Sequence, residues 1–132
     1  MQLVCVPPDR AAQAWPLAQP MIVAAMRRGG VSAVDPVCDD VLAGRALLWL
    51  AWDGQEIAAA AVTEIGTVNG RKLCTIVGCG GHGRANWLHL IEGLESFARA
   101  EGCEATRIIG RKGWSRLLPE YRQKAVILER AL

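Results

Sequence analysis

Residues 76–95, IVGCGGHGRANWLHLIEGLE, pass from an apolar run through four glycines in six residues and then into a helical pattern. A glycine costs conformational entropy on folding, so several together indicate that something must approach the backbone closely. An apolar run before the glycines and a periodic pattern after them predict a strand, a glycine loop and a helix in succession. This segment limits the chain to folds in which a strand leads directly into a helix.

The remaining sequence predicts a mixed α/β class. Turn signals at Asp53-Gly54 and in residues 66–70 separate three apolar runs, which indicates a meander of strands. After the glycines, apolar residues recur at helical spacing, and Asn86 stands where a cap belongs. Residues 9–30 are expected to form one helix kinked at Pro16 and Pro20, or two short helices. The expected order then continues with a loop at 27–40, strands at 46–53, 56–65 and 71–78, the helix after Asn86, a strand at 104–111, a short helix at 112–122 and a last strand at 124–132.

Size and charge narrow the function classes. The chain has 132 residues, which predicts one domain spanning residues 1–132. Fifteen basic and thirteen acidic side chains nearly balance, so the charge pattern favours neither nucleic acid nor a membrane surface. We expect a cytoplasmic protein, because no signal-like start and no apolar run of about eighteen residues is present. The five cysteines lack paired spacing, which predicts reduced thiols.

The element order and the glycine segment resemble those of the GCN5-related N-acetyltransferase superfamily, especially its short members from bacteriophages and prophages. In that family a loop of pattern Gln/Arg-x-x-Gly-x-Gly/Ala holds the pyrophosphate of an acyl-coenzyme A. Gly81 and Gly83 match the two glycines, whereas Gly78 stands where the family has Gln or Arg. The likeness covers about residues 47–132, and GRKGWSRLLPEYR at 110–122 supports it. It implies a mostly antiparallel twisted sheet with splayed middle strands, flanked by helices.

The same resemblance implies an acetyl-coenzyme A-dependent N-acyltransferase, in which an amine of an unidentified acceptor attacks the thioester directly, in a bacterial or phage-infected cell. Unpaired amides at the start of a helix suit a phosphate, which agrees with the family role of the glycine loop. The residues expected to hold the coenzyme are Ile76, Val77, Gly78, Cys79, Gly80, Gly81, His82, Gly83, Arg84 and Arg111. A glycine loop that only turns the chain is the simpler alternative.

Three side chains are candidates for proton transfer. Glu64 is the first candidate for the general base, since it is a carboxylate on a mostly apolar strand, and Glu56 is the second. Tyr121 is the candidate for the acid that protonates the leaving thiolate, although it lies one turn later than the family's tyrosine, where this chain has Leu118. Solvent-facing glutamates and a packing tyrosine are the plainer interpretations. A catalytically eroded domain that binds a partner or belongs to a phage particle therefore remains the alternative function.

Other site types fit the sequence less well. The segment also spells Gly-x-Gly-x-x-Gly, but it follows a meander instead of opening a βαβ unit, which argues against a dinucleotide site. Cys74, Cys79, His82 and Cys103 lack the paired spacing of a metal site, so we expect no metal. The last strand would leave an apolar edge that a symmetric homodimer would cover.

Overall fold

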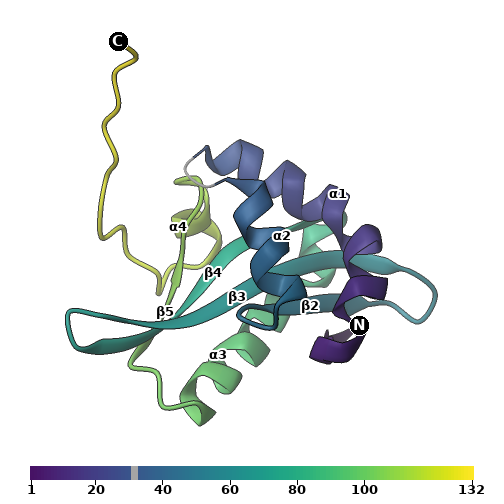
Figure 1. The fold of residues 1–132 in the computed structure, drawn as a ribbon. Coiled ribbons are helices and arrows are strands. Elements are labelled where there is room, and N and C mark those ends of the chain that lie inside the picture. Colours follow the sequence, from purple (N-terminus) through teal and green to yellow (C-terminus); the bar gives the residue numbers. More distant parts are fainter. Residues whose placement is uncertain (31–32) are drawn as a thin grey trace.

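The computed structural model describes residues 1–30 and 33–132 and shows a five-stranded sheet (Figure 1). The strands lie side by side in chain order, and every neighbouring pair is antiparallel except the last, β4 with β5. Their bounds are β1 Gln2–Cys5, β2 Leu47–Trp52, β3 Ile57–Val68, β4 Arg71–Gly81 and β5 Ala105–Ile108. The predicted mixed class with a mostly antiparallel sheet is confirmed.

Helices cover both faces of this sheet (Figure 1). On one face, α1 (Ala11–Gly29) and α2 (Val34–Leu42) bury apolar side chains such as Ile22 and Val41 against Val62 of β3. On the other face, α3 (Ile91–Ala100) packs Leu94 against Trp49. A short helix, α4 (Trp114–Leu117), follows β5. No helix in the described ranges is both long and apolar enough to cross a membrane.

The central meander has the turn chemistry that its sequence predicts. Asp53 Oδ1 accepts hydrogen bonds of 2.8 Å from the backbone N–H groups of Gln55 and Glu56, which closes the turn between β2 and β3. Asn69 and Gly70 have φ angles of 51° and 77°, the left-handed pair that a tight hairpin requires between β3 and β4. The predicted three strands, the strand at β5 and the short helix at α4 are confirmed.

Toward the ends of the chain, two expectations are wrong and one strand was not predicted. Residues 2–5 form an unpredicted edge strand, β1, which pairs with β2. Of the two alternatives for residues 9–30, the structure has the single helix: α1 continues through Pro16 and Pro20, because its buried face anchors it on both sides of each proline. Described residues 34–42 of the expected loop form α2. Residues 124–132, expected as a strand, have no regular structure and are exposed, since no strand of the described chain lies beside them.

The glycine segment is also organised differently from the prediction. Gly78 to Gly81 belong to β4 and pair with β3, so only His82 and Gly83 form the loop. A Cβ on Gly78 would lie 3.2 Å from Met26 Cγ, and one on Gly80 would lie 3.0 Å from Ala25 Cβ. Helix α1 is therefore what comes close to the backbone at these two glycines.

The helix after the glycines begins later than predicted. Residues 84–86 and 88–90 form two 3₁₀ turns, and α3 begins at Ile91. Asn86 lies inside the first turn and makes no side-chain capping bond, so the predicted cap is wrong. Trp87 explains the break, because its indole is buried and its Nε1–H donates a 2.9 Å bond to the carbonyl oxygen of His82. Holding this ring under the loop requires a tighter path than an α-helix follows.

Candidate active site between β4 and β5

A cavity opens where β4 and β5 separate. Their register ends at the pair Ile76 and Ile108, after which Ile109 still donates a 3.2 Å bond to the carbonyl of Ile76. Beyond that point β4 continues beside β3 alone, so the two parallel strands splay as expected. The cavity holds about 350 Å³ of space, part of it open to solvent. Its lining comprises Ala25, Arg28, Val77, Gly78, Cys79, Ile108, Ile109, Gly110, Arg111 and Trp114.

A β-bulge lies in the wall of this cavity. The register of β3 with β4 passes from Thr63 opposite Ile76 to Val62 opposite Gly78, so Val77 is an extra residue on β4. Bulges bend a strand and re-aim its backbone groups. The bulge therefore helps to turn β4 away from β5. It also shifts the β3–β4 register by one residue at the point where the cavity begins.

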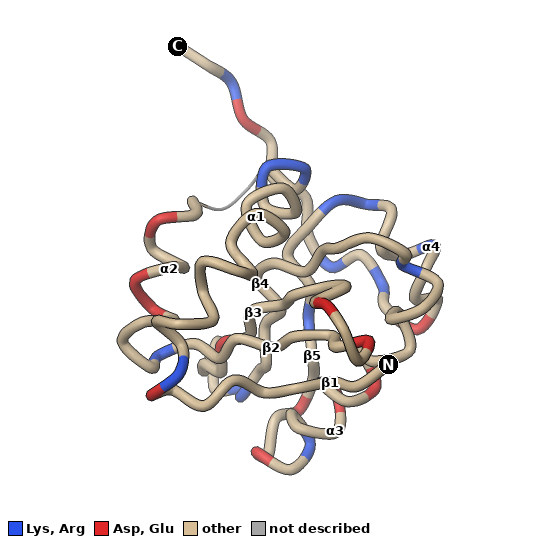
Figure 2. Tube along the Cα trace, turned by 90° about the vertical axis from the view of Figure 1, so that its right-hand side faces the viewer, with Lys and Arg blue, Asp and Glu red and all other residues tan. Residues whose placement is uncertain are grey.

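Two arginines from distant parts of the chain line the cavity. Arg28 lies in the last turn of α1, and its guanidinium approaches to 3.3 Å of the position that a Cβ on Gly80 would occupy. Arg111 comes from the connection after β5. Basic positions gather at the end of α1 and around α4, whereas acidic ones lie along α2 (Figure 2). The sequence predicted Arg111 but missed Arg28, because basic residues at a helix end are common for another reason, the helix dipole.

The loop after β4 presents free backbone donors. His82 N–H donates 3.0 Å to Ala58, and Asn86 N–H donates 2.8 Å to Gly83. Between them, the amides of Gly83, Arg84 and Ala85 donate no hydrogen bond to any residue that the structure describes. Consecutive free amides suit an anion. The expected phosphate donors therefore lie in the loop and the first 3₁₀ turn, five or more residues before α3 begins.

The candidate base lies beside the cavity without lining it. Glu64 is half-buried on β3, opposite Thr75 and thus two residues before the bulge at Val77 on β4. Strand alternation places Glu64 on the sheet face of Val62, the face that α1 covers. Glu56, the second candidate, is exposed, and its Oε1 lies 3.8 Å from His82 Nε2.

Tyr121, the candidate acid, lies outside the lining of the cavity. The Tyr121 hydroxyl lies 2.6 Å from Thr106 Oγ1 and donates a 2.8 Å bond to Glu95 Oε2. Burial, with a smaller contribution from Glu95, raises the pKa of Tyr121 to about 12. Tyr121 thus connects the chain after α4 to β5 and α3, and it does not line the cavity. Its proposed acid role stays a prediction, whereas its packing role is visible.

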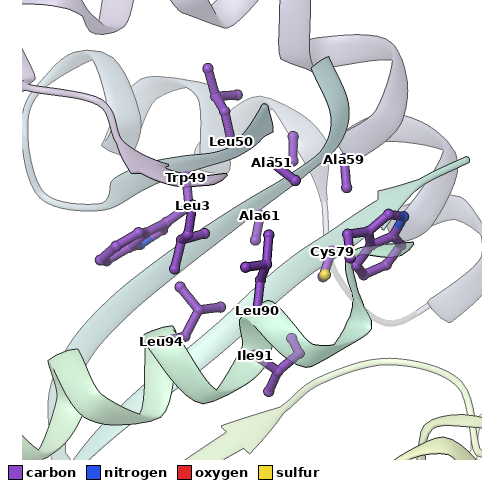
Figure 3. Close-up of a pocket in the computed structure, with 12 residues that line it drawn as sticks. Leu3, Trp49, Leu50, Ala51, Ala59, Ala61, Cys79, Leu90, Ile91 and Leu94 are labelled. Atoms are coloured by element: carbon purple, nitrogen blue, oxygen red, sulfur yellow. The ribbon is translucent and has the colours of Figure 1, made fainter. Parts of the chain in front are cut away.

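A second, wholly apolar cavity lies on the other face of the sheet. Figure 3 shows Leu90 and Leu94 directed toward Leu3 and the sheet, with the sulfur of Cys79 near Leu90. Burial raises the pKa of the Cys79 thiol to about 12, so this thiol is a protonated packing group at neutral pH. With no polar side chain to orient a ligand, the apolar cavity is a gap in the core and the β4–β5 cavity is the better candidate site.

No cluster of three His, Cys, Asp or Glu side chains suited to a metal ion occurs in residues 1–30 and 33–132. Cys74 is buried, and burial raises its pKa to about 11. His82, in contrast, is exposed on its loop. The described donors therefore give no positive indication of a metal centre.

Comparison with known proteins relates this geometry to a fold. No family model and no curated protein matches the sequence. An aminoglycoside acetyltransferase from an uncultured soil metagenomic sample, solved with sisomicin, superposes with a TM-score of 0.70 at 12% identity, covering 99% of this chain and 95% of that one. A ribosomal-protein-alanine N-acetyltransferase from Brucella melitensis gives 0.66 at 12%, covering 99% and 100%. The chain has the GCN5-related N-acetyltransferase fold.

One protein with a similar structure is described as a regulator and not as an acetyltransferase. A transcriptional regulator from Bacillus halodurans superposes with a TM-score of 0.64 at 14% identity, covering 99% of both chains. At these identities the likeness establishes architecture, and function has to be argued from the site.

Proposed function

We propose that this protein is an acyl-coenzyme A-dependent N-acyltransferase that transfers an acetyl group to an amine. The observation that carries the proposal is the cavity between the splayed ends of β4 and β5, which two arginines line. Separated strands leave backbone edges with which an extended amide-bearing arm pairs as an added strand. The pantetheine arm of coenzyme A has that chemistry, and it would lie along residues 76–79 of β4.

The phosphates would bind at the carboxyl-terminal end of β4. The free amides of Gly83, Arg84 and Ala85 supply donors there, and Arg28 and Arg111 supply charge. Arg28 is the important cation in this proposal, because Gly78 stands where the family has a Gln or Arg. Its guanidinium reaches over Gly80, which has no side chain in the way. We propose that α1 supplies the cation that β4 lacks.

The chemical step needs few side chains. The neutral amine attacks the thioester carbonyl, so a C–N bond forms and the C–S bond breaks, with a backbone N–H of β4 near the bulge stabilising the oxyanion. Glu64 removes the surplus amine proton through water, since it lies on the α1 side of the sheet beside the bulge. The departing thiolate takes a proton either from water or from Tyr121, whose hydroxyl would first have to leave Glu95.

Calorimetric titration with acetyl-coenzyme A tests whether the protein binds the coenzyme and gives its Kd. In a thermal-shift measurement, acetyl-coenzyme A at a hundred times this Kd should raise the free energy of unfolding by about 2.7 kcal/mol. Arg28→Gln should weaken binding by about 10- to 100-fold, the equivalent of about 1.5–3 kcal/mol for a charge-assisted hydrogen bond. Arg27→Gln is the matched control, because its neighbour position on α1 does not line the cavity and should leave Kd unchanged. No binding of any acyl-coenzyme A would refute the proposal.

A non-catalytic binding role, including a phage-associated one, is the second candidate. It is favoured by the position of Tyr121, whose hydroxyl is engaged with Glu95 and Thr106 and does not line the cavity. Mass-spectrometric detection of an acetylated product across a panel of amines separates the two functions. Binding of acetyl-coenzyme A without turnover on any amine would support the second, whereas a Glu64→Gln variant that binds normally but turns over slowly would support the first.

A further inference from the structure

A row of three polar side chains crosses the sheet beside the β-bulge. Glu64 of β3 lies opposite Thr75 of β4, and Thr75 lies opposite Arg107 of β5. Residues opposite one another project from the same face of a sheet, so a carboxylate, a hydroxyl and a guanidinium stand next to each other. Arg107 Nε donates a 2.9 Å bond to Thr75 Oγ1, as a shared face requires. This polar row, Glu64, Thr75 and Arg107, lies on the face opposite to Ile108, which packs against the α3 side.

The two charged ends of the polar row have no counter-ion within the described chain. Glu64 is half-buried, yet its carboxylate forms no ion pair or side-chain hydrogen bond with residues 1–30 or 33–132. In the same ranges Arg107 uses only Nε, so both of its terminal nitrogens are left for a bidentate contact with a carboxylate. This arrangement suits a ligand that carries both a positive and a negative charge.

The polar row adjoins the proposed reaction centre and is open on its outer side. Thr75 precedes the bulge residue Val77 by two residues, which is about 7 Å along a strand. On β3, Gly66 follows Glu64 on the same face, and a Cβ there would meet no described heavy atom within 4 Å. A small acceptor entering over Gly66 would therefore bring its amine close to the thioester.

We propose, resting on the acyltransferase function proposed above, that the acceptor is a free α-amino acid bound across the polar row. Its amine lies at the Glu64 end, and its carboxylate forms a bidentate pair with Arg107. Neighbouring strands are about 4.8 Å apart, so the backbones of Glu64 and Arg107 are about 10 Å apart. Two charge-assisted bonds of about 2.8 Å, with one amino acid between them, fit this separation.

The reaction on this acceptor balances without another reagent. Glu64 takes the surplus proton of the ammonium group through water, which leaves a neutral amine. The amine nitrogen bonds to the acyl carbon as the C–S bond breaks, and its second proton ends on the thiolate of coenzyme A. The products are an N-acyl amino acid and free coenzyme A.

The charges of the polar row argue against other classes of amine. A diamine or polyamine would bring a second cation toward Arg107, and like charges repel. The amino terminus of a peptide has an amide where the free amino acid has its carboxylate, so it would leave the guanidinium without a charged partner. A free amino acid satisfies both ends of the polar row.

Rates on amino acids and their carboxamides test this acceptor class. Each common amino acid is compared with its carboxamide, which mimics a peptide, and the acetylated product is measured by mass spectrometry with acetyl-coenzyme A as donor. For the best amino acid, kcat/KM should exceed that of its carboxamide by at least about 10-fold, because only the carboxylate forms the charge-assisted pair. Equal rates on every acid and its carboxamide would overturn the inference.

Substitution of Arg107 tests the residue that reads the carboxylate. Arg107→Gln should raise KM for the best amino acid by about 10- to 100-fold, leave kcat and the Kd of acetyl-coenzyme A unchanged, and abolish the preference over the carboxamide. Arg107→Lys keeps the charge without the bidentate geometry, so its KM should lie between the two. Arg71→Gln is the matched control, because Arg71 lies four residues from Thr75 on β4 and is bonded to Glu104 at 2.9 Å. It should change KM by less than about threefold.

The possible outcomes separate the acceptor class from the proposed function. Acetylation of other amines without any preference for amino acids would refute the amino acid site and leave N-acyl transfer standing. An Arg107→Gln variant that keeps the preference over the carboxamide would refute the role of the polar row. No binding of acetyl-coenzyme A to the wild-type chain would refute both the function and the site.

Discussion

Gly81→Ala tests whether the glycine segment is shaped by backbone packing. A Cβ on Gly81 would lie 2.2 Å from the carbonyl oxygen of Ala58, about 0.8 Å inside the 3.0 Å limit that real Cβ atoms respect. It would also lie 2.6 Å from Ala59 Cα, so both obstacles are backbone and neither can rotate away. The ends of β3 and β4 must therefore separate, and the 3.0 Å bond from His82 N–H to Ala58 is lost.

The expected cost follows from these two changes. A lost backbone hydrogen bond costs about 1 kcal/mol, and overpacking adds about 1–3 kcal/mol. The free energy of unfolding should fall by about 2–4 kcal/mol, and Tm by about 10 °C for a chain of this length. Urea unfolding followed by tryptophan fluorescence measures the change directly.

Gly66→Ala is the matched control for this prediction. Gly66 also lies in the β3–β4 pair, but a Cβ there would meet no heavy atom within 4 Å. Its free energy of unfolding should equal that of the wild type or exceed it by up to about 1 kcal/mol, because alanine restricts the unfolded chain. Equal urea midpoints for the Gly81→Ala variant and the wild type would show that the strand ends yield freely, and the reasoning from close approach would be wrong.

Three further outcomes are expected. Gly80→Val should lower the free energy of unfolding by about 1–3 kcal/mol in urea titration, because its side chain enters the contact with Ala25 and Met21; an unchanged midpoint would mean that α1 is not seated there. Tyr121→Phe should lower it by about 1–2 kcal/mol at pH 7, through the loss of the hydroxyl's bonds to Thr106 and Glu95. Because folding raises the pKa of Tyr121 from 10 to about 12, the stability that its hydroxyl contributes is complete below pH 10 and is lost between about pH 10 and 12. The difference in unfolding free energy between the wild type and Tyr121→Phe should therefore shrink over that window. A difference that stays constant would contradict this pKa shift. Alkylation followed by mass spectrometry at pH 8 should modify exposed Cys5 before Cys74 and Cys79, whose thiols burial keeps protonated; early labelling of Cys79 would place it outside the core.

The parts of the fold that depend on local chemistry could be predicted from the sequence. Turns at Asp53-Gly54 and Asn69-Gly70 and the apolar runs between them define the meander, because turn geometry depends on the residues within the turn. Three of the four glycines, Gly78, Gly80 and Gly81, do mark a close approach to the backbone, whereas Gly83 has a φ of 64°. That α1 approaches Gly78 and Gly80 was not predictable, since the contact joins residues about fifty positions apart and has no local signature.

Other differences come from tertiary packing that overrides local preference. Pro16 and Pro20 break an isolated helix, yet the buried face of α1 holds the helix together across them. The late start of α3 comes from the buried Trp87 ring. Residues 124–132 have strand propensity but no partner strand within the described chain. At the site, Arg111 followed from the family likeness, whereas Arg28 required knowing where α1 ends.

The last turns of helix α1 lie over the cavity between β4 and β5. Its last turns lie against Gly78 and Gly80, and a Cβ on Gly29 would lie only 3.3 Å from Gly110 Cα on the far side. One helix therefore lies against both sides of the cavity. A substitution in the buried stripe of α1 that shifts the helix by a fraction of an ångström would therefore change the width of the cavity between β4 and β5 from both sides at once.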